Sequence, residues 1–117
     1  MEIWINPACS KCRAATAALD GAGVSYTVRR YLDNPPTAEE LTEVLTRLDL
    51  APWHLVRMNE PAAVPLKSLP RDEAHRADWI EAMVTNPILI QRPILTTDDG
   101  TTAVAREPET LTRLLNP

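Results

Sequence analysis

Cysteine and histidine are scarce in this sequence, with two residues of each among 117. Two cysteines are too few for the disulfide framework that stabilises small secreted domains. A structural zinc site needs four ligands, and neither His54 nor His75 stands at a recognisable ligand spacing from Cys9 and Cys12. The scarcity therefore argues against both a disulfide-stabilised module and a structural metal site.

Long apolar runs and blocks of like charge are also missing. No segment approaches the length of a membrane span, and the N-terminus carries no signal-peptide pattern. The net charge of −4 argues against a nucleic-acid-binding surface. A chain of this length can bury one core without disulfide bonds. We therefore expect a single domain over residues 1–117, monomeric and cytoplasmic, without nucleic-acid or membrane partners.

Both cysteines fall within one short segment, Asn6–Arg13, between two elements of different type. The apolar run Ile3–Ile5 before it predicts a buried strand, and the alanine-rich stretch 14–19 after it predicts a helix. A thiol at a helix start lies near unpaired backbone N–H groups and the positive end of the helix dipole, which favour the thiolate. The charges of Lys11 and Arg13 act in the same direction. This pattern favours redox or nucleophilic chemistry over a metal knuckle or inert buried thiols.

Residue patterns in the first two thirds of the chain predict a β-α-β unit followed by helices. The first helix is expected to end near residues 20–23, and residues 25–31 predict a second strand. Thr37–Glu40 has the form of a capping box before an amphipathic helix. The proline-containing stretch 50–70 predicts short helical turns, and a further helix is expected over 71–85. That helix is indicated by the spacing of Ala74, Ala77, Ile80, Met83 and Val84.

The last part of the sequence predicts a β-hairpin and a final helix. Residues 94–97 and 101–104 are expected to be strands around a turn at Asp98-Asp99-Gly100. The segment Glu107-Pro108-Glu109 favours a helix start, because proline and acidic residues suit the first turn. The predicted class is therefore α/β. Its order is β-α-β, a helical insert at about residues 37–85, and β-β-α, built around a mixed four-stranded sheet.

This order, with a cysteine motif at the first helix, resembles the thioredoxin fold. In that fold a proline opens the third strand, usually after a cis peptide bond, and faces the active cysteine; Pro93 is the matching position. More narrowly, the chain resembles the arsenate reductase family of thioredoxin-fold proteins, of the glutaredoxin-linked type. The matching segments follow the family's order over nearly the whole length: Asn6-Pro7-Ala8-Cys9, Tyr31-Leu32, Pro35-Pro36-Thr37, Leu55-Val56-Arg57 with Asn59, residues 86–94, and Arg106.

The resemblance implies that Cys9 attacks arsenate without any bound cofactor. The residues that it places around the small oxyanion are Arg57, Arg92, Arg106, Asn6 and Ser10. Because arsenate is anionic, an approaching thiolate is repelled, and guanidinium groups neutralise that charge while binding two oxygens at once. They also stabilise the charge that develops as an oxygen leaves. Three arginines in matching contexts are therefore expected to form an oxyanion site rather than surface ion pairs.

Two positions depart from the family's pattern. The family's arsenate reducers carry a histidine where this sequence has Ile5, and usually a serine where it has Cys12. In the family an external thiol, first glutathione and then glutaredoxin, regenerates the cysteine. Here Cys12 could instead attack Cys9 and leave a Cys9–Cys12 disulfide. The electron donor would then be a thioredoxin-like protein or another low-molecular-weight thiol, and the sequence does not choose among these donors.

Two other functions stay open from the residues alone. A general dithiol oxidoreductase would use the Cys9–Cys12 pair on protein or small disulfides and would not need the arginines. An Spx-type regulator shares the fold, a C-x-x-C near the N-terminus and the Arg-Pro-Ile segment, and would bind RNA polymerase with the cysteine pair as a redox switch. Such regulators are longer and lack the full arginine set, so the pattern favours the reductase interpretation.

Overall fold

The computed structural model of the chain describes residues 1–116 and divides into two compact units. The first unit comprises Met1–Asn34 and Arg92–Pro117, and the second is Pro35–Gln91. The helical insert expected at about residues 37–85 lies inside the second unit, and a single domain over the whole chain stays a prediction. Among the described residues, no helix combines the length and the apolar character that a membrane crossing requires.

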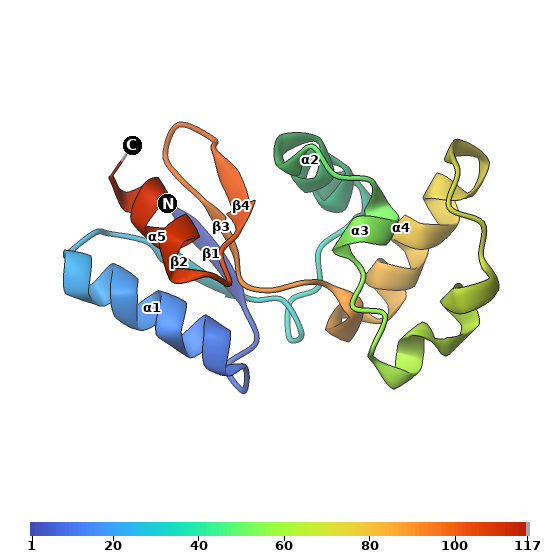
Figure 1. Cartoon of the computed structure of the whole chain (residues 1–117), viewed down its shortest axis with the longest axis horizontal. Helices are drawn as coiled ribbons and strands as arrows, with labels where there is room; N and C mark the ends of the chain where they lie inside the picture. The colour runs from blue at the N-terminus through green and yellow to red at the C-terminus, as the bar shows by residue number, and fades with distance from the viewer. Residues whose placement is uncertain (117) are drawn as a thin grey trace. The chain divides into compact units, whose positions relative to one another are not determined.

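A mixed four-stranded sheet forms the centre of the first unit (Figure 1), with the strand order β2-β1-β3-β4. Its strands are β1 (Glu2–Ile5), β2 (Thr27–Arg30), β3 (Ile94–Thr96) and β4 (Thr102–Val104). Strand β1 is parallel to β2 and antiparallel to β3, which is antiparallel to β4. A parallel pair needs a crossover connection, which helix α1 (Ser10–Ala22) supplies, and helix α5 (Pro108–Leu115) follows β4. The predicted fold class is confirmed.

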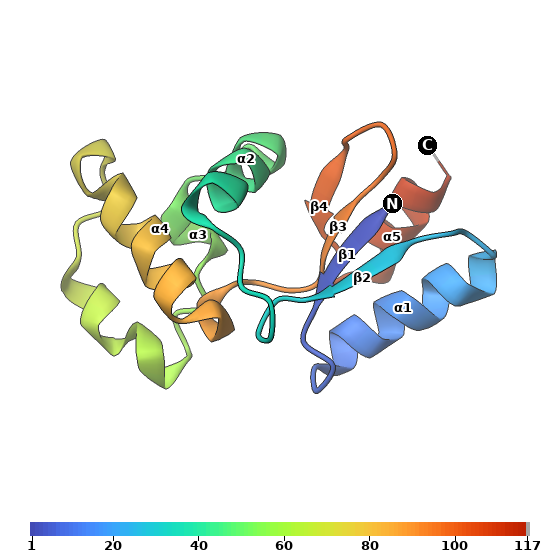
Figure 2. The same cartoon turned by 180° about the vertical axis from the view of Figure 1, so that it is seen from behind.

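The core of the first unit lies between one face of the sheet and these two helices, as the view from behind also shows (Figure 2). Side chains alternate across a strand, so Ile3 and Ile5 point to the same face. The buried cluster on that face also contains Cys12, Ala15, Leu19, Leu95, Ala105, Leu111 and Leu114. Helix α1 ends where predicted, because Gly23 adopts a φ of 70°, a left-handed conformation that costs glycine little.

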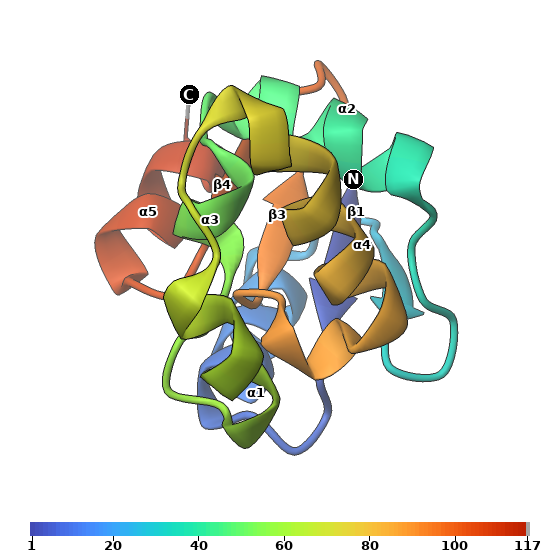
Figure 3. The same ribbon diagram turned by 90° about the vertical axis from the view of Figure 1, so that its right-hand side faces the viewer.

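The second unit is helical (Figure 3). Its elements are α2 (Ala38–Leu48), α3 (Pro52–Leu55), α4 (Arg76–Thr85) and the 3₁₀ helices η1 (Pro61–Ser68), η2 (Glu73–His75) and η3 (Pro87–Leu89). The predicted capping box is present, since the Glu40 N–H donates to Thr37 Oγ1 at 3.1 Å and the Thr37 N–H donates to Glu40 Oε1 at 3.0 Å. Two orphan backbone donors are thereby satisfied at the start of α2.

Helix α4 starts later than the sequence spacing indicated, and the two alanines of that spacing are not part of its buried face. Ala74 lies in the preceding 3₁₀ helix, and both Ala74 and Ala77 are exposed. The buried face contains the predicted Ile80 and Met83 together with Trp79, whose indole N–H donates to the Pro70 carbonyl at 2.9 Å. A tryptophan buries far more apolar area than an alanine and gains a partner for its polar end. Side-chain size therefore decided the packing at this helix.

Candidate active site

Cys9 is the N-cap residue of α1, in the turn that follows β1, with extended backbone angles of φ −84° and ψ 125°. Asn6 shapes this turn. Its side-chain Oδ1 accepts a hydrogen bond from the Ala8 N–H at 3.0 Å, and its backbone carbonyl accepts one from the Cys9 N–H at 2.9 Å. Asn6 is buried, whereas Ser10, the first residue of the helix, is exposed. The contacts of Asn6 identify it as a positioning residue for Cys9, and the oxyanion contacts expected of Asn6 and Ser10 stay predictions.

The two thiols differ in their exposure to solvent. Both cysteines are free, and Cys9 is half-buried whereas Cys12 has no exposed surface. Cys12 belongs to the core cluster and Cys9 packs against that cluster. An N-cap side chain lies beside the N–H groups of the second and third helical residues, which here are Lys11 and Cys12. The first turn of α1 therefore brings both sulfur atoms together.

The surroundings of Cys9 favour its thiolate. Burial acts to raise its pKa, but this is outweighed by interactions with the backbone N–H and the thiol of Cys12, the backbone N–H of Lys11 and the guanidinium of Arg92. Together they lower the pKa of Cys9 from 9.0 to about 7. The exposed side-chain charges of Lys11 and Arg13, which the sequence predicted would help, act less strongly on this pKa than these interactions. Roughly half of Cys9 is therefore thiolate at neutral pH.

Cys12 has the opposite electrostatic character. Burial raises its pKa, a backbone interaction at Asn6 lowers it, and the negative charge of Cys9 raises it further, to about 11. Cys12 therefore stays a protonated thiol beside the Cys9 thiolate and acts as a hydrogen-bond donor to it. The sequence predicts Cys12 as a resolving thiol or as one half of a redox pair, and not as a donor to the Cys9 thiolate. The signal for the donor role is its place at the third helical position, within reach of the N-cap side chain.

Two of the three predicted arginines lie in the same unit as Cys9. Ile94 of β3 pairs with Trp4 of β1 in antiparallel register. Asn6 lies two residues after Trp4 and Arg92 lies two residues before Ile94, so this register places Arg92 across from the turn at Asn6. Arg92 is buried, with 6% of its surface exposed, and the peptide bond that joins it to Pro93 is cis.

Arg106 follows β4 and is tied to the same segment. Its Nη1 donates to the backbone carbonyl of Arg92 at 2.7 Å. The structure therefore gathers Cys9, Cys12 and Arg92 and anchors Arg106 to the main chain beside them.

Arg57 belongs to the second unit, in the segment that follows α3. Its backbone N–H donates to the Leu89 carbonyl at 2.7 Å, and the neighbouring Val56 forms a β-bridge with Ile90. The Arg57 Nη1 lies 3.3 Å from Glu60 Oε1, and both side chains are largely buried. Backbone pairing and this ion pair hold the side chain within its own unit. Its expected place at the oxyanion site stays a prediction.

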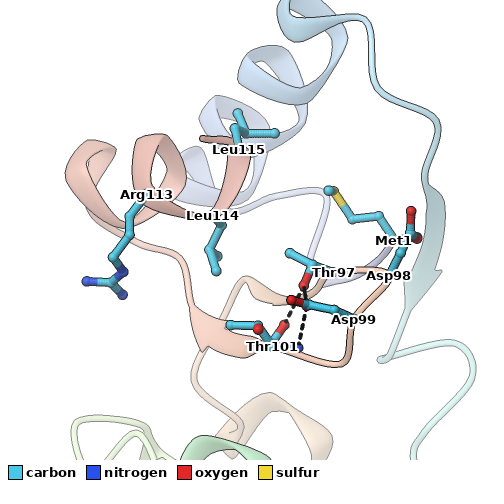
Figure 4. Close-up of a pocket in the computed structure, with 8 residues that line it drawn as sticks. All are labelled: Met1, Thr97, Asp98, Asp99, Thr101, Arg113, Leu114 and Leu115. Atoms are coloured by element: carbon cyan, nitrogen blue, oxygen red, sulfur yellow. Dashed lines mark hydrogen bonds and ion pairs between the residues drawn. The ribbon is translucent and has the colours of Figure 1, made fainter. Parts of the chain in front are cut away.

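A cavity of about 480 Å³ lies at the other end of β1 from Cys9 (Figure 4). It is lined by Met1, Thr97, Asp98, Asp99, Thr101, Arg113, Leu114 and Leu115. Hydrogen bonds from Thr97 and Thr101 lower the pKa of Asp99 there. These lining residues include none of the predicted site residues. The cavity is therefore separate from the thiols.

Known proteins resemble this chain over nearly its whole length. The model of the ArsC family matches residues 4–114. The chain is 53% identical over 111 residues to a Streptomyces viridochromogenes protein called "Uncharacterized protein in glnII region", with 93% of each chain covered. It is 32% identical to an arsenate reductase of Neisseria meningitidis, covering 98% of this chain and 97% of that one. The solved arsenate reductase from Vibrio cholerae superposes with a TM-score of 0.83 at 32% identity, covering 97% and 98% of the two chains.

Proposed function

The chain belongs to the ArsC family, and on that basis we propose that it is an arsenate reductase with Cys9 as its nucleophile. The observation that carries the proposal is the position of the Cys9 thiol at the N-cap of α1, where the first-turn N–H groups and the Arg92 guanidinium lower its pKa. Relatives that match this chain over nearly their whole length are named arsenate reductases. The electrons come from an external thiol reductant, and no bound cofactor takes part.

In the first step, the Cys9 thiolate attacks the arsenic atom of arsenate. A sulfur–arsenic bond forms, one arsenic–oxygen bond breaks, and the departing hydroxide takes up a proton and leaves as water. Arsenic stays pentavalent. Arg92 and Arg106 bind the remaining oxygens, because guanidinium groups pair with oxyanions in two-point contacts and stabilise the charge of the transition state.

In the second step, Cys12 resolves the intermediate. The negative charge of Cys9 raises the pKa of Cys12. Bonding to arsenic removes this charge, so the pKa of Cys12 falls. The Cys12 sulfur, as a thiolate, attacks the Cys9 sulfur; the disulfide forms and the electron pair of the sulfur–arsenic bond passes to arsenic. Arsenic becomes trivalent, takes up protons and leaves as arsenite. A dithiol protein or a low-molecular-weight thiol then reduces the Cys9–Cys12 disulfide by exchange.

Arg57 is the third arginine of the proposal and is carried over from the family resemblance alone. In the alternative route of the family, glutathione and glutaredoxin resolve Cys9 and leave Cys12 untouched. The two routes differ in the number of thiols that one turnover consumes.

Steady-state consumption of reducing equivalents tests the proposal. The reduced protein is supplied with arsenate and, in parallel assays, with a thioredoxin system or with glutathione and glutaredoxin. We expect arsenate-dependent oxidation that disappears in Cys9→Ser. The variant Arg13→Ala, which changes an exposed residue of the same helical turn, is the matched control and should retain the activity. Arsenate reduction that survives Cys9→Ser would overturn the proposal.

A general dithiol oxidoreductase is the second candidate, because the pair combines an ionised half-buried thiol with a protonated buried one. Such an enzyme would reduce disulfides without help from the arginines. Activity on a disulfide substrate that is unchanged in Arg106→Ala, together with no activity on arsenate, would select it.

A further inference from the structure

We propose that the reduced Cys9–Cys12 pair also binds trivalent arsenic as a dithiolate, so that arsenite holds the reduced protein in an inactive form. The binding site follows from the arrangement of the two thiols. That this binding is inhibition of the enzyme by its own product rests on the proposed function.

The arrangement of the thiols suits a ligand that arrives in two stages. Cys9 is half-buried at the N-cap of α1 and therefore open to solvent, whereas Cys12 is fully buried one turn into the helix. The two side chains lie on the same turn, since Cys9 is the N-cap of α1 and Cys12 its third residue, and Cys9 packs against the core cluster that contains Cys12. A ligand can thus bond Cys9 first and then close a ring onto Cys12 without crossing the core.

The number of sulfur ligands selects the kind of ion. Thiolates prefer soft ions, but zinc wants four protein ligands in a structural site. Within residues 1–116, no group of three or more His, Cys, Asp and Glu side chains could hold a metal ion. The pair therefore offers two sulfur atoms and no third protein ligand. Trivalent arsenic fits this set, since it can take two thiolates and keep one hydroxyl group.

The binding reaction balances without any change of oxidation state. Arsenous acid, As(OH)₃, reacts with the two thiols; two sulfur–arsenic bonds form, two arsenic–oxygen bonds break, and two water molecules leave. The Cys9 thiolate makes the first bond at neutral pH. The second bond is intramolecular, and its high effective concentration strengthens binding by about 10² to 10⁴ over a single thiol. The disulfide form of the protein has no free thiol and does not bind.

Arsenous acid is uncharged at neutral pH, which separates this binding from arsenate reduction. An anion needs guanidinium groups to approach a thiolate, whereas a neutral molecule does not. Binding of arsenite should therefore be independent of Arg106, a residue on which the proposed reaction depends.

Titration of the fully reduced protein with sodium arsenite, in the absence of arsenate, tests the inference. Free thiols are counted with a chromogenic disulfide reagent after each addition. We expect one arsenite to protect two thiols, and we expect Cys9→Ser and Cys12→Ser to bind arsenite at least about a hundredfold more weakly. Serine is a good N-cap residue, so Cys9→Ser should fold normally. Arg13→Ala and Arg106→Ala should bind arsenite as the unmodified protein does.

Two outcomes would overturn the inference: arsenite that protects neither thiol, or single-cysteine variants that bind as tightly as the unmodified protein. Failure of the proposed function gives a different pattern. In that case arsenate is not reduced, yet arsenite still protects both thiols, and the dithiol site stands.

Discussion

The Cys12 thiol should control the ionisation of Cys9, and replacing it by alanine or by serine separates its two roles. Cys12→Ala removes the group that donates to the Cys9 thiolate. Cys12→Ser keeps a hydroxyl donor at the same position. Both variants remove the resolving sulfur, so any difference between them in the reactivity of Cys9 reports the hydrogen bond alone.

The magnitude follows from the interactions at the helix start. Four interactions oppose the effect of burial and lower the pKa of Cys9 from 9.0 to about 7, which is roughly a hundredfold increase in the ratio of thiolate to thiol. The Cys12 thiol ranks second among the four, so its loss should lower that ratio by about threefold. In Cys12→Ala the backbone N–H groups and Arg92 still act, so the pKa should settle between 7 and 9. In Cys12→Ser it should stay near 7.

The assay is the rate of Cys9 alkylation by iodoacetamide between pH 5 and pH 10. Only the thiolate reacts, so the rate should be low in acid, rise through pH 7 as the proton leaves, and level off above pH 8. Cys12 is buried with a pKa of about 11 and contributes little over most of this range. Protein unfolded in urea is the control and should show a midpoint near 9. An unchanged midpoint in Cys12→Ala, or equal shifts in both variants, would show that the Cys12 thiol does not set the pKa of Cys9.

Three further changes test the turn, the oxyanion site and the second unit. Asn6→Ala removes the acceptor of the Ala8 N–H, so the free energy of unfolding in urea should fall by about 0.5–1.5 kcal/mol; an unchanged midpoint would contradict the role of this turn. Arg106→Lys keeps the charge but loses the two-point contact, so kcat/KM for arsenate should fall by about 10²–10³, while an unaltered value would remove Arg106 from the site. Thr37→Ala breaks the capping box and should cost about 1 kcal/mol in the same urea assay, and no loss would show that the cap is unimportant.

The fold was largely predictable because local signals agree with the long-range pairing. The apolar run Ile3–Ile5 became the central strand, and the glycine at position 23 ends α1 in the left-handed conformation that the sequence suggested. The capping box at Thr37 starts α2 as expected. Helix α4 was harder in part: the predicted Ile80 and Met83 are buried, but the alanines carry a weak burial signal and Trp79, outside the predicted spacing, joins the buried face.

The candidate site was predictable in its thiols but not in what activates them. Cys9 at a helix start is a local feature of the sequence. Arg92 lowers the pKa of Cys9 because the antiparallel register of β1 and β3 brings residues more than eighty positions apart to the same turn. In the sequence, the charges of Lys11 and Arg13 look as able as that of Arg92 to favour the Cys9 thiolate. Only burial and pairing, which arise from the tertiary fold, distinguish Arg92 from them.

A single-turnover experiment measures whether the reduction of one arsenate consumes both thiols. Reduced protein is mixed with one equivalent of arsenate and no external thiol, and arsenite and free thiols are then measured in the same sample. We expect one arsenite to form, both thiols to be lost, and a Cys9–Cys12 disulfide to appear in the peptide map. No arsenite, with both thiols still free, would contradict it. Arsenite formed in a Cys9→Ser sample would contradict it equally.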